Sequence, residues 1–463
     1  MALIEGQVYT GAAAKPFSRQ PPGKCILSLV MGKPSRRHFL SLSAAAVATR
    51  AARAAGPNDR IRVGLIGSGG ISRGDLTAFL AFPEVDCPVV CDVDDARIAA
   101  GVALVEKLRN KRPDTVKDFR RVIDRKDIDV CLVCTPDHWH ALPTVLACQA
   151  GKDVYCEKPL ATTIAEGRAA VEAARRHQRV LQMGTQWRSG PHYQEAVEFV
   201  HSGKLGRIRQ VRAWAYLDWV GGIGHPPDGV PPPGADYDFW LGPAPQRPFN
   251  PNRFHFNFRW FWDYAGGLMT DWGVHLINLA LWAMGPAPPR SVTSTGGKYV
   301  VDDNTETPDT QTAVYEFPTY TLIWEHQMLG GVGLGGRPHG LSFSGSEATL
   351  IVDGRGWEVI PEPKRKNFVI KRAVDPQDRD SDGRKAHVGN FLECVRSRKD
   401  PVTNVEVGHF VTAVSALGNI ALRTGGKIVW DAAQERVAGD AQANALVSRV
   451  YRKPWSLPYL RSS

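Results

Sequence analysis

Lysine, aspartate and histidine residues in two separate stretches have the spacing for chemistry on an alcohol. Lys158 ends the mostly apolar run from Asp153 and stands directly before Pro159, which has no N–H to donate to a strand ladder. The lysine is therefore predicted at the carboxyl end of a strand, where open parallel α/β sheets bind ligands. There it would hold a substrate hydroxyl and stabilise the alkoxide as hydride leaves. The alternative, which these residues alone favour, is a surface lysine beside a turn proline.

The second stretch is a predicted helix from Leu268 to Met284 that is apolar nearly all round. Asp271, His275 and Asn278 recur on it at i, i+4 and i+7, so they form one polar stripe on a helix that should be buried. Buried polar groups need partners, and a substrate is one such partner. His275 is predicted to act as general base toward a hydroxyl, with Asp271 orienting it or relaying the proton.

Three alternatives for this stripe stay open. Asp271 caps the helix, His275 is a satisfied core histidine, or the pair binds a metal. No third ligand is evident in the sequence, so no metal is expected.

A glycine-rich turn follows the first predicted strand, which starts at Ile61. Gly67 and Gly69 fit the pattern G-x-G-x-x-G, but Ser72 replaces its third glycine. Glycines let the backbone approach a pyrophosphate, which free N–H groups at a helix N-terminus would bind. Asp92 ends a second strand, where an acid accepts from ribose hydroxyls and repels a 2′-phosphate, so NAD is favoured over NADP. The alternative is that Asp92 caps the next helix.

The fold class predicted from these elements is α/β. Residues 58–184 are expected to form a doubly wound parallel sheet of the Rossmann type, with later strands near 114–117, 128–134 and 180–183 and helices over 139–150 and 163–177. Residues 185–430 are expected to form an α+β domain with a helix at 191–202 and an open, mostly antiparallel sheet that packs on another subunit. Its strands are predicted at 208–216, 312–317, 320–326 and 349–352. Residues 431–463 are expected to be a tail, part of it helical, that packs on the body.

Residues 217–264 are rich in proline, glycine and aromatic side chains. A loop of this length is either disordered or functional, and the aromatic content favours order. Flat rings suit stacking under the C–H face of a sugar, and the alternative is that they fill a satellite core.

Four motifs in order resemble the Gfo/Idh/MocA family, whose members include glucose-fructose oxidoreductases and inositol dehydrogenases. They are Gly-Leu-Ile-Gly-Ser-Gly-Gly at 64–70, Cys-Thr-Pro-Asp-His-Trp-His at 134–140, Glu-Lys-Pro-Leu at 157–160 and Gly-Gly-Leu-Met-Thr-Asp-Trp-Gly-Val-His at 266–275. The resemblance covers the chain from residue 60 onward. It implies NAD-dependent oxidation of a CH–OH group of a sugar or polyol by a homo-oligomer, a dimer or tetramer.

The resemblance also implies residue roles. Lys158 would touch both nicotinamide and substrate, often with a cis bond before Pro159. The residues expected to be catalytic are Lys158, Asp271 and His275. Those expected to bind the cofactor are Gly67, Ser68, Gly69, Gly70, Ile71, Asp92, Thr135, Pro136, His138, His140, Glu157 and Lys158. Those expected to bind substrate are Arg188, Trp262, Tyr264, Asp271 and His275.

Two other function classes stay open. Some relatives oxidise a sugar only transiently and cleave its glycosidic bond by elimination, which would make this chain an NAD-dependent glycoside hydrolase or lyase. The other class is a binding protein that has lost turnover.

Residues 1–55 resemble a twin-arginine export signal, with Arg36 and Arg37 before an alanine-rich run. That run is shorter than the roughly 20 residues that span a bilayer, so no membrane helix is expected after cleavage. Because the arginines usually lie close to the start, Met31 is the expected initiator. A periplasmic location follows, and the alternative is a basic tail.

Charge and cysteine content exclude two further classes. Most of the formal net charge of +10 lies in residues 1–54, so a nucleic-acid surface is not indicated. The cysteines cluster on predicted strands and are expected to be buried hydrophobes, and the pair Cys131 and Cys134 lies within one apolar strand, which argues against zinc.

Overall fold

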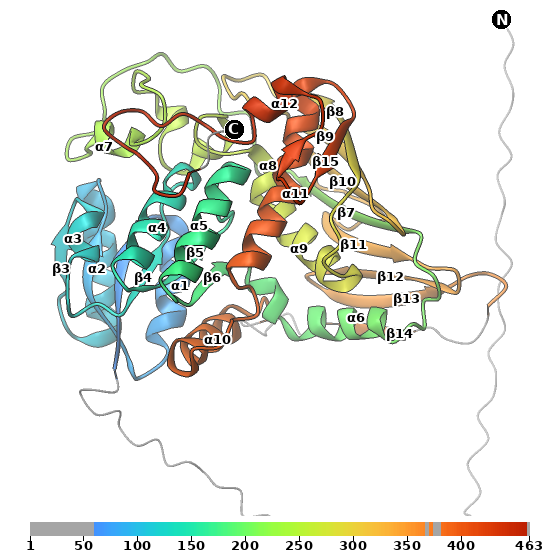
Figure 1. Cartoon of the computed structure of the whole chain (residues 1–463), viewed down its shortest axis with the longest axis horizontal. Helices are drawn as coiled ribbons and strands as arrows, with labels where there is room; N and C mark the ends of the chain where they lie inside the picture. The colour runs from blue at the N-terminus through green and yellow to red at the C-terminus, as the bar shows by residue number, and fades with distance from the viewer. Residues whose placement is uncertain (1–59, 366–369, 374–380, 461–463) are drawn as a thin grey trace, which may run out of the picture. The chain divides into compact units, whose positions relative to one another are not determined.

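The computed structural model of the 463-residue chain describes residues 60–365, 370–373 and 381–460. The predicted export signal lies outside these residues. Figure 1 shows two sheets with helices packed on them, the first drawn in blue to green and the second mainly in yellow to orange.

The first sheet has six parallel strands in the order β3-β2-β1-β4-β5-β6. The strands are β1 (Ile61–Ile66), β2 (Val85–Cys91), β3 (Asp114–Val116), β4 (Val130–Val133), β5 (Asp153–Glu157) and β6 (Leu181–Gly184). The central strands are almost entirely buried, as expected for a parallel sheet covered on both faces. The strand order reverses between β1 and β4, and ligands bind at such a switch point. The predicted Rossmann fold is confirmed.

Five helices connect these strands: α1 (Gly70–Leu80), α2 (Asp95–Arg109), α3 (Phe119–Ile123), α4 (Ala141–Gln149) and α5 (Ile164–Arg176). Local sequence fixes several of their ends. The side chain of Asp94 caps α2 by accepting from the N–H of Ala96. Thr163 and Glu166 form a reciprocal capping box at the start of α5.

The second sheet has ten strands in the order β14-β13-β12-β11-β7-β10-β9-β8-β15-β16. They are β7 (Gln210–Leu217), β8 (Ser291–Gly297), β9 (Thr310–Glu316), β10 (Thr321–Met328), β11 (His339–Ser344), β12 (Ala348–Asp353), β13 (Gly356–Pro361), β14 (Ile370–Ala373), β15 (Ile428–Asp431) and β16 (Arg436–Val437). Only β7 and β10 pair in parallel, so the predicted mostly antiparallel sheet is confirmed. The helices α6 (Pro191–His201) and α9 (Gly273–Met284) pack on this sheet.

Two helices late in the chain were not predicted, and both contact the first domain. α10 (Arg384–Ser397) packs on α1, where Phe391 meets Phe79 and Tyr155 edge to face. α11 (Val405–Thr424) contacts α5, α9 and β8. Among the described residues it is the one helix with the length and apolarity of a membrane span, but most of it is buried inside the fold. Its apolar residues therefore belong to the core.

The aromatic segment 217–264 is ordered. It forms α7 (Tyr237–Leu241) and the 3₁₀ helices η3 (Pro251–Arg253) and η4 (His255–Trp260). Trp240 and Trp260 are buried, so these rings fill a satellite core, whereas Trp219 and Phe256 are about half exposed. The chain end joins this cluster, because Trp455 packs against Trp139 and Phe239.

The predicted helical part of the chain end is reduced to the five-residue α12 (Ala441–Ala445). All cysteines in the described part of the chain are free and buried, as predicted.

Candidate active site

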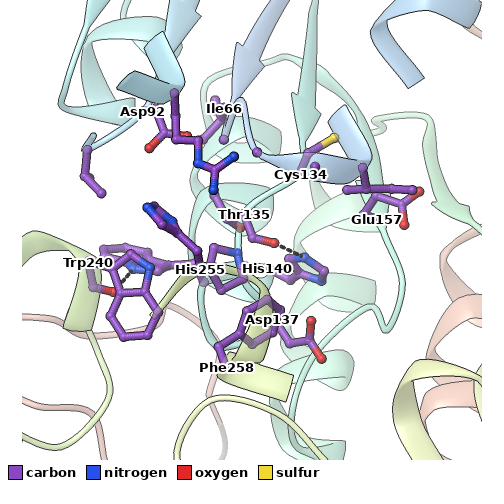
Figure 2. Close-up of a pocket in the computed structure, with 18 of the residues that line it drawn as sticks. Ile66, Asp92, Cys134, Thr135, Asp137, His140, Glu157, Trp240, His255 and Phe258 are labelled. Carbon is purple, nitrogen blue, oxygen red and sulfur yellow. Dashed lines mark hydrogen bonds between the residues drawn. The ribbon is translucent and has the colours of Figure 1, made fainter. Parts of the chain in front are cut away.

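A cavity of about 540 Å³ opens at the carboxyl edge of the first sheet (Figure 2). Its walls come from the turn before α1, the ends of β2 and β5, the loop after β4, and the aromatic segment. This is the switch point of the sheet, where the Rossmann fold binds a dinucleotide.

The glycine turn has the geometry of a pyrophosphate site. Gly67 has a φ of +87°, and a Cβ there would lie 2.7 Å from the backbone of Cys134 and Thr135, so the position requires glycine. No side chain caps α1, which leaves its first N–H groups free for an anion. Ser72, which replaces the third glycine, donates to the carbonyl of Gly69 at 2.6 Å and so closes the turn from within.

Asp92 lies on the cavity wall at the end of β2, where the sequence predicts a ribose contact. Its carboxylate accepts from the backbone N–H groups of Ser68 (2.8 Å) and Asp94 (3.1 Å). Burial raises the pKa of Asp92, and these N–H groups and Arg97 oppose the rise. Asp94 takes the helix cap, so Asp92 is not an N-cap.

The loop after β4 brings three predicted residues, Thr135, Pro136 and His140, to the cavity and turns His138 away. Thr135 and Pro136 line the cavity, and the buried hydroxyl of Thr135 has no partner within the protein, which suits a ligand. The ring nitrogens of His140 lie 2.8 Å from the carbonyl oxygen of Thr135 and 2.5 Å from that of Pro159, and the single N–H of the neutral ring donates to one of the two. His138 points instead into the aromatic core, where its ring nitrogen bonds the carbonyl of Trp240 at 2.9 Å.

Lys158 lies at the end of β5 on the cavity wall, and the bond before Pro159 is cis, as the resemblance implied. Its ammonium group donates to the carboxylate of Asp271 at 2.6 Å and to the carbonyl of the same residue at 2.9 Å. The guanidinium of Arg259 donates to the same carboxylate at 3.1 Å. All three side chains are less than 20% exposed, so they form a nearly buried charge cluster.

The predicted helix 268–284 is broken at Trp272 into α8 (Gly267–Asp271) and α9. In a continuous helix the carbonyl of Asp271 would accept from the N–H of His275. Here that N–H bonds the carbonyl of Trp272 instead, and the carbonyl of Asp271 is free to accept from Lys158. The break therefore gives Lys158 a second partner.

The expectation that Asp271 orients His275 is wrong in this structure, because the Asp271 carboxylate bonds Lys158 and Arg259. His275 stacks on Trp187 with ring centroids 4.7 Å apart, and its Nδ1 is buried without a partner. Burial holds the pKa of His275 well below its usual value, so the ring is neutral at rest. Lys158 lowers the same pKa, so the two groups lie near each other.

The other predicted substrate residues, Arg188, Trp262 and Tyr264, have different surroundings. Arg188 donates to Asn278 at 3.1 Å, and burial lowers the pKa of Arg188 to about 10. Trp262 stacks with the guanidinium of Arg423, and Tyr264 is fully buried beside Trp240. Tyr264 therefore belongs to the satellite core rather than to a substrate surface.

A strap from the second domain bonds the first domain just beyond the end of β2. We use this name for residues 234–236 and His255. An antiparallel bridge pairs Ala235 with Asp94, and the ring of His255 bonds the Asp94 carboxylate at 2.8 Å. The ammonium of Lys117 adds a bond to the carbonyl of Gly234 at 2.8 Å. His255 lies in the cavity wall and has a φ of +51°, an uncommon conformation for a residue other than glycine.

Among the cavity residues that the sequence did not predict, three titratable side chains lie close to the predicted site. Arg259 and His255 lie in a loop without a periodic pattern, so no signal marked them. Asp137 lies inside the motif Thr-Pro-Asp-His and lines the cavity, and its position at the end of β4 could have identified it. Within the described ranges, no group of three or more His, Cys, Asp or Glu side chains has the geometry of a metal site.

Two family profiles match the chain. Residues 61–185 match the NAD-binding Rossmann fold of the Gfo/Idh/MocA oxidoreductase family. Residues 204–293 and 374–457 match the C-terminal alpha/beta domain of the same family.

Curated relatives match over a shorter stretch. Levoglucosan dehydrogenase of Pseudarthrobacter phenanthrenivorans is 31% identical over 166 residues, which are 34% of this chain and 42% of that protein. The alpha-N-acetylgalactosaminidase of Shewanella oneidensis is 27% identical over 161 residues, 34% of this chain and 35% of that protein. The chain thus spans less than half the length of these relatives.

Solved structures share the fold over most of the chain. Levoglucosan dehydrogenase in complex with NADH and levoglucosan superposes with a TM-score of 0.63 at 17% identity, over 80% of this chain and 99% of that chain. The WlbA dehydrogenase of Bordetella pertussis in complex with NADH and UDP-GlcNAcA gives a TM-score of 0.60 at 19% identity, over 80% and 99% of the two chains. At these identities the likeness establishes the two-domain fold.

Proposed function

Because the chain belongs to the Gfo/Idh/MocA oxidoreductase family and its first domain is that family's NAD-binding Rossmann domain, we propose that it oxidises a CH–OH group of a sugar or polyol. The observation that carries the proposal is Lys158, which lies on the wall of the cofactor cavity with its ammonium group fixed by Asp271. A cation held at the nicotinamide end of a dinucleotide cavity is placed to bind an alcohol oxygen.

The residues that fit the cofactor are those of the glycine turn, Asp92 and Thr135. The free N–H groups of α1 would hold the pyrophosphate, and Asp92 would accept from the adenosine ribose. Bound NAD would supply the hydride acceptor, nicotinamide C4.

Lys158 would donate a hydrogen bond to the substrate hydroxyl and stabilise negative charge on that oxygen. Asp271 stays ionised, because Lys158 and Arg259 lower its pKa against the effect of burial. The anion holds the ammonium group in place, which makes Asp271 a positioning residue. His275 is neutral, and we assign it the role of the base that accepts the hydroxyl proton.

The alternative function is glycoside cleavage through transient oxidation. Its support is the similarity to a protein named alpha-N-acetylgalactosaminidase and to several named glycosyl hydrolase family 109 proteins. The same cofactor cavity and the same lysine would serve both reactions, because both begin with oxidation of a CH–OH group.

We also propose that the protein is exported and that it holds its cofactor tightly. The support for export is the Arg36-Arg37 motif. Since free NAD is expected to be scarce outside the inner membrane, a loosely bound cofactor would be lost by mass action. We further propose that the chain forms a homo-oligomer through its second sheet.

The proposed function is tested by a screen of sugars, polyols and aryl glycosides with the purified protein. Nicotinamide absorbance reports oxidation, and released aglycone reports glycoside cleavage. A change in nicotinamide absorbance without aglycone release supports the oxidoreductase. Aglycone release without net nicotinamide reduction supports the alternative, and the absence of both signals with added NAD contradicts the two functions together.

A further inference from the structure

Asp137 is a cavity carboxyl group that the oxidation described above does not use. It follows β4 in the motif Thr-Pro-Asp and begins the 3₁₀ helix η1 (Asp137–Trp139). The residue is 7% exposed and lines the same cavity as Lys158 and Phe258, and Figure 2 shows it on the loop that also carries Thr135 and His140. A carboxyl group in this place reaches the cavity from the first domain.

The charged groups that face Asp137 come from three other elements. Lys158 at the end of β5 and Arg259 in η4 attract its negative charge, and Asp271 in α8 repels it. Both cations are hydrogen bonded to Asp271, and no salt bridge within the described residues involves Asp137. Cys156 on β5 lies near it as a buried thiol, and the neighbouring rings His138 and His140 are neutral because burial lowers their pKa values.

The cluster therefore holds two carboxyl groups in opposite states. The two bound cations keep Asp271 ionised. Asp137 lacks such bonds, and burial raises its pKa to about 7 despite the attraction of Arg259 and Lys158. A group with a pKa near neutrality both accepts and donates protons efficiently.

Oxidation of an alcohol releases one proton, and the proposed function assigns that proton to His275. Asp137, which lines the cavity together with Lys158, is thus left over as a second proton carrier. Resting on the proposed function, we infer that Asp137 exchanges a proton with the sugar carbon next to the oxidised carbon.

The chemistry balances without a further reagent. Once the CH–OH carbon is a ketone, the neighbouring C–H bond breaks, its proton passes to the Asp137 carboxylate, and its electron pair forms an enolate. Lys158 lies where the enolate oxygen would carry the charge, which it stabilises as it does the alkoxide. Return of the proton restores the ketone.

When the substrate carries an O-linked group on the carbon beyond the enolate, the electron pair expels that group and the C–O bond breaks. The leaving oxygen then takes the proton from Asp137. The step makes the site competent for glycosides as well as for free sugars.

The test uses the full-length protein with bound NAD in deuterated water and a sugar that reduces the nicotinamide in the screen above. In one turnover, absorbance follows hydride transfer, and mass spectrometry of the recovered sugar follows deuterium on carbon. For the wild type we expect reduced nicotinamide and deuterium at the carbon next to the oxidised one. Exchange should rise with pH and level off above about 7, because only the ionised Asp137 accepts a proton.

Asp137→Asn keeps the shape of the side chain and removes the proton carrier. We expect its exchange to fall by about 100-fold or more, with nicotinamide reduction within about tenfold of wild type. The matched control is Asp263→Asn in the aromatic segment, whose carboxylate pairs with Arg247 outside the cavity lining and whose loss should change neither signal.

Three outcomes overturn the inference: no deuterium in the wild type despite reduced nicotinamide, wild-type exchange in Asp137→Asn, or equal loss of both signals in that variant. The last outcome would place Asp137 in the hydride step or in folding. If no sugar reduces the nicotinamide in the wild type, the proposed function itself fails, and the two failures are thereby distinct.

Discussion

Lys158 is the residue whose chemistry depends most on a contact that sequence alone does not show. Its side chain is 11% exposed, and its ammonium group makes two bonds to Asp271, one to the carboxylate and one to the backbone carbonyl. Removing one member of a buried ion pair leaves the other charge uncompensated. Arg259 limits the destabilisation expected on loss of Lys158, because it still neutralises the Asp271 carboxylate.

Lys158→Met keeps the aliphatic stem and removes the charge. We expect turnover to fall by about 100- to 1000-fold, because charge on the substrate oxygen is no longer stabilised. Unfolding free energy should fall by about 1–3 kcal/mol, since Asp271 loses one of two cations. Lys427→Met, at an exposed pair with Glu316, is the control. Near wild-type turnover in Lys158→Met would show that the lysine is structural.

Asp92→Ala tests the nucleotide end of the cavity. The substitution removes the acceptor for ribose hydroxyls and the repulsion of a 2′-phosphate, so NAD affinity should fall by about 10- to 100-fold while NADP affinity falls less. Titration calorimetry with both nucleotides measures the difference. Asp86→Ala, on the same strand, is the control. Equal losses for the two nucleotides would mean that Asp92 does not face the ribose.

Single residues were predictable where a motif fixes a backbone position. Gly67 and Lys158 follow from strand ends and from the conformational limits of glycine and proline. Arg259 and His255 were not predictable, because tertiary folding of the aromatic segment brings them to the cavity. Asp137 was visible in the sequence, but its raised pKa comes from burial in the folded protein, which outweighs the attraction of Arg259 and Lys158.

Among the elements, the helix pair α8 and α9 shows how a tertiary contact overrides a periodic pattern. The apolar residues from Leu268 to Met284 predict one helix, but the chain breaks at Trp272, so Asp271 lies on α8 while His275 and Asn278 lie on α9. The side chain of Lys158 bonds a carbonyl that a continuous helix would have used itself. No local sequence signal reports a partner that lies more than 100 residues earlier in the chain.

The late helix α11 was missed for a different reason. Most of its residues are buried against α5, α9 and β8, so it lacks the polar face that marks an amphipathic helix. Its ends are nevertheless ordinary, with Asn404 as N-cap and Gly425 in the left-handed conformation after its last turn.

The strap is the element through which the proposed tight retention of the cofactor can be tested. His255→Ala removes the bond to Asp94, and loss of about 1 kcal/mol should speed nucleotide release by about five- to tenfold. Protein isolated with bound nucleotide is dialysed and then denatured, and the nucleotide that stayed bound through dialysis is assayed. His225→Ala, which loses an exposed contact to Asp302, is the control.

We expect near-stoichiometric nucleotide in the wild type and less in His255→Ala. A wild type that is empty as isolated and works only with millimolar added NAD would contradict tight retention.

At the scale of the whole molecule, the sequence predicted the parallel first sheet, the mostly antiparallel character and four strands of the second sheet, and a ligand site at the carboxyl edge of the first. It did not predict that the chain returns to the first domain through α10 and that the chain end joins the aromatic core through Trp455. These contacts depend on the complementary shapes of surfaces that are far apart in the sequence. A periodic pattern of apolar residues does not predict them.

The proposed export concerns the whole molecule. A folded protein that binds NAD before transport retains its cofactor only if the nucleotide dissociates slowly. A reporter fused to residues 31–60 should leave the cytoplasm when Arg36 and Arg37 are intact and remain there when both are lysine. Cell fractionation measures the distribution. Export of the double-lysine fusion would point to a different route.

The central claim is that a sugar gives its hydride to NAD beside Lys158. A sugar chosen from the screen, with deuterium in place of its carbon-bound hydrogens, is mixed with the NAD-loaded protein. The nucleotide is recovered by denaturing the protein, and its mass is measured by mass spectrometry. We predict one deuterium on the nicotinamide ring in the wild type and a slower appearance of that label in Lys158→Met, by about 100-fold or more. In a net oxidation the label stays on the nicotinamide, whereas in a redox-neutral reaction the same deuterium returns to the sugar, so the protein is denatured during the first turnover, while the nicotinamide is reduced. Consumption of the sugar without label on the nicotinamide, or equal labelling in the two proteins, would contradict the account.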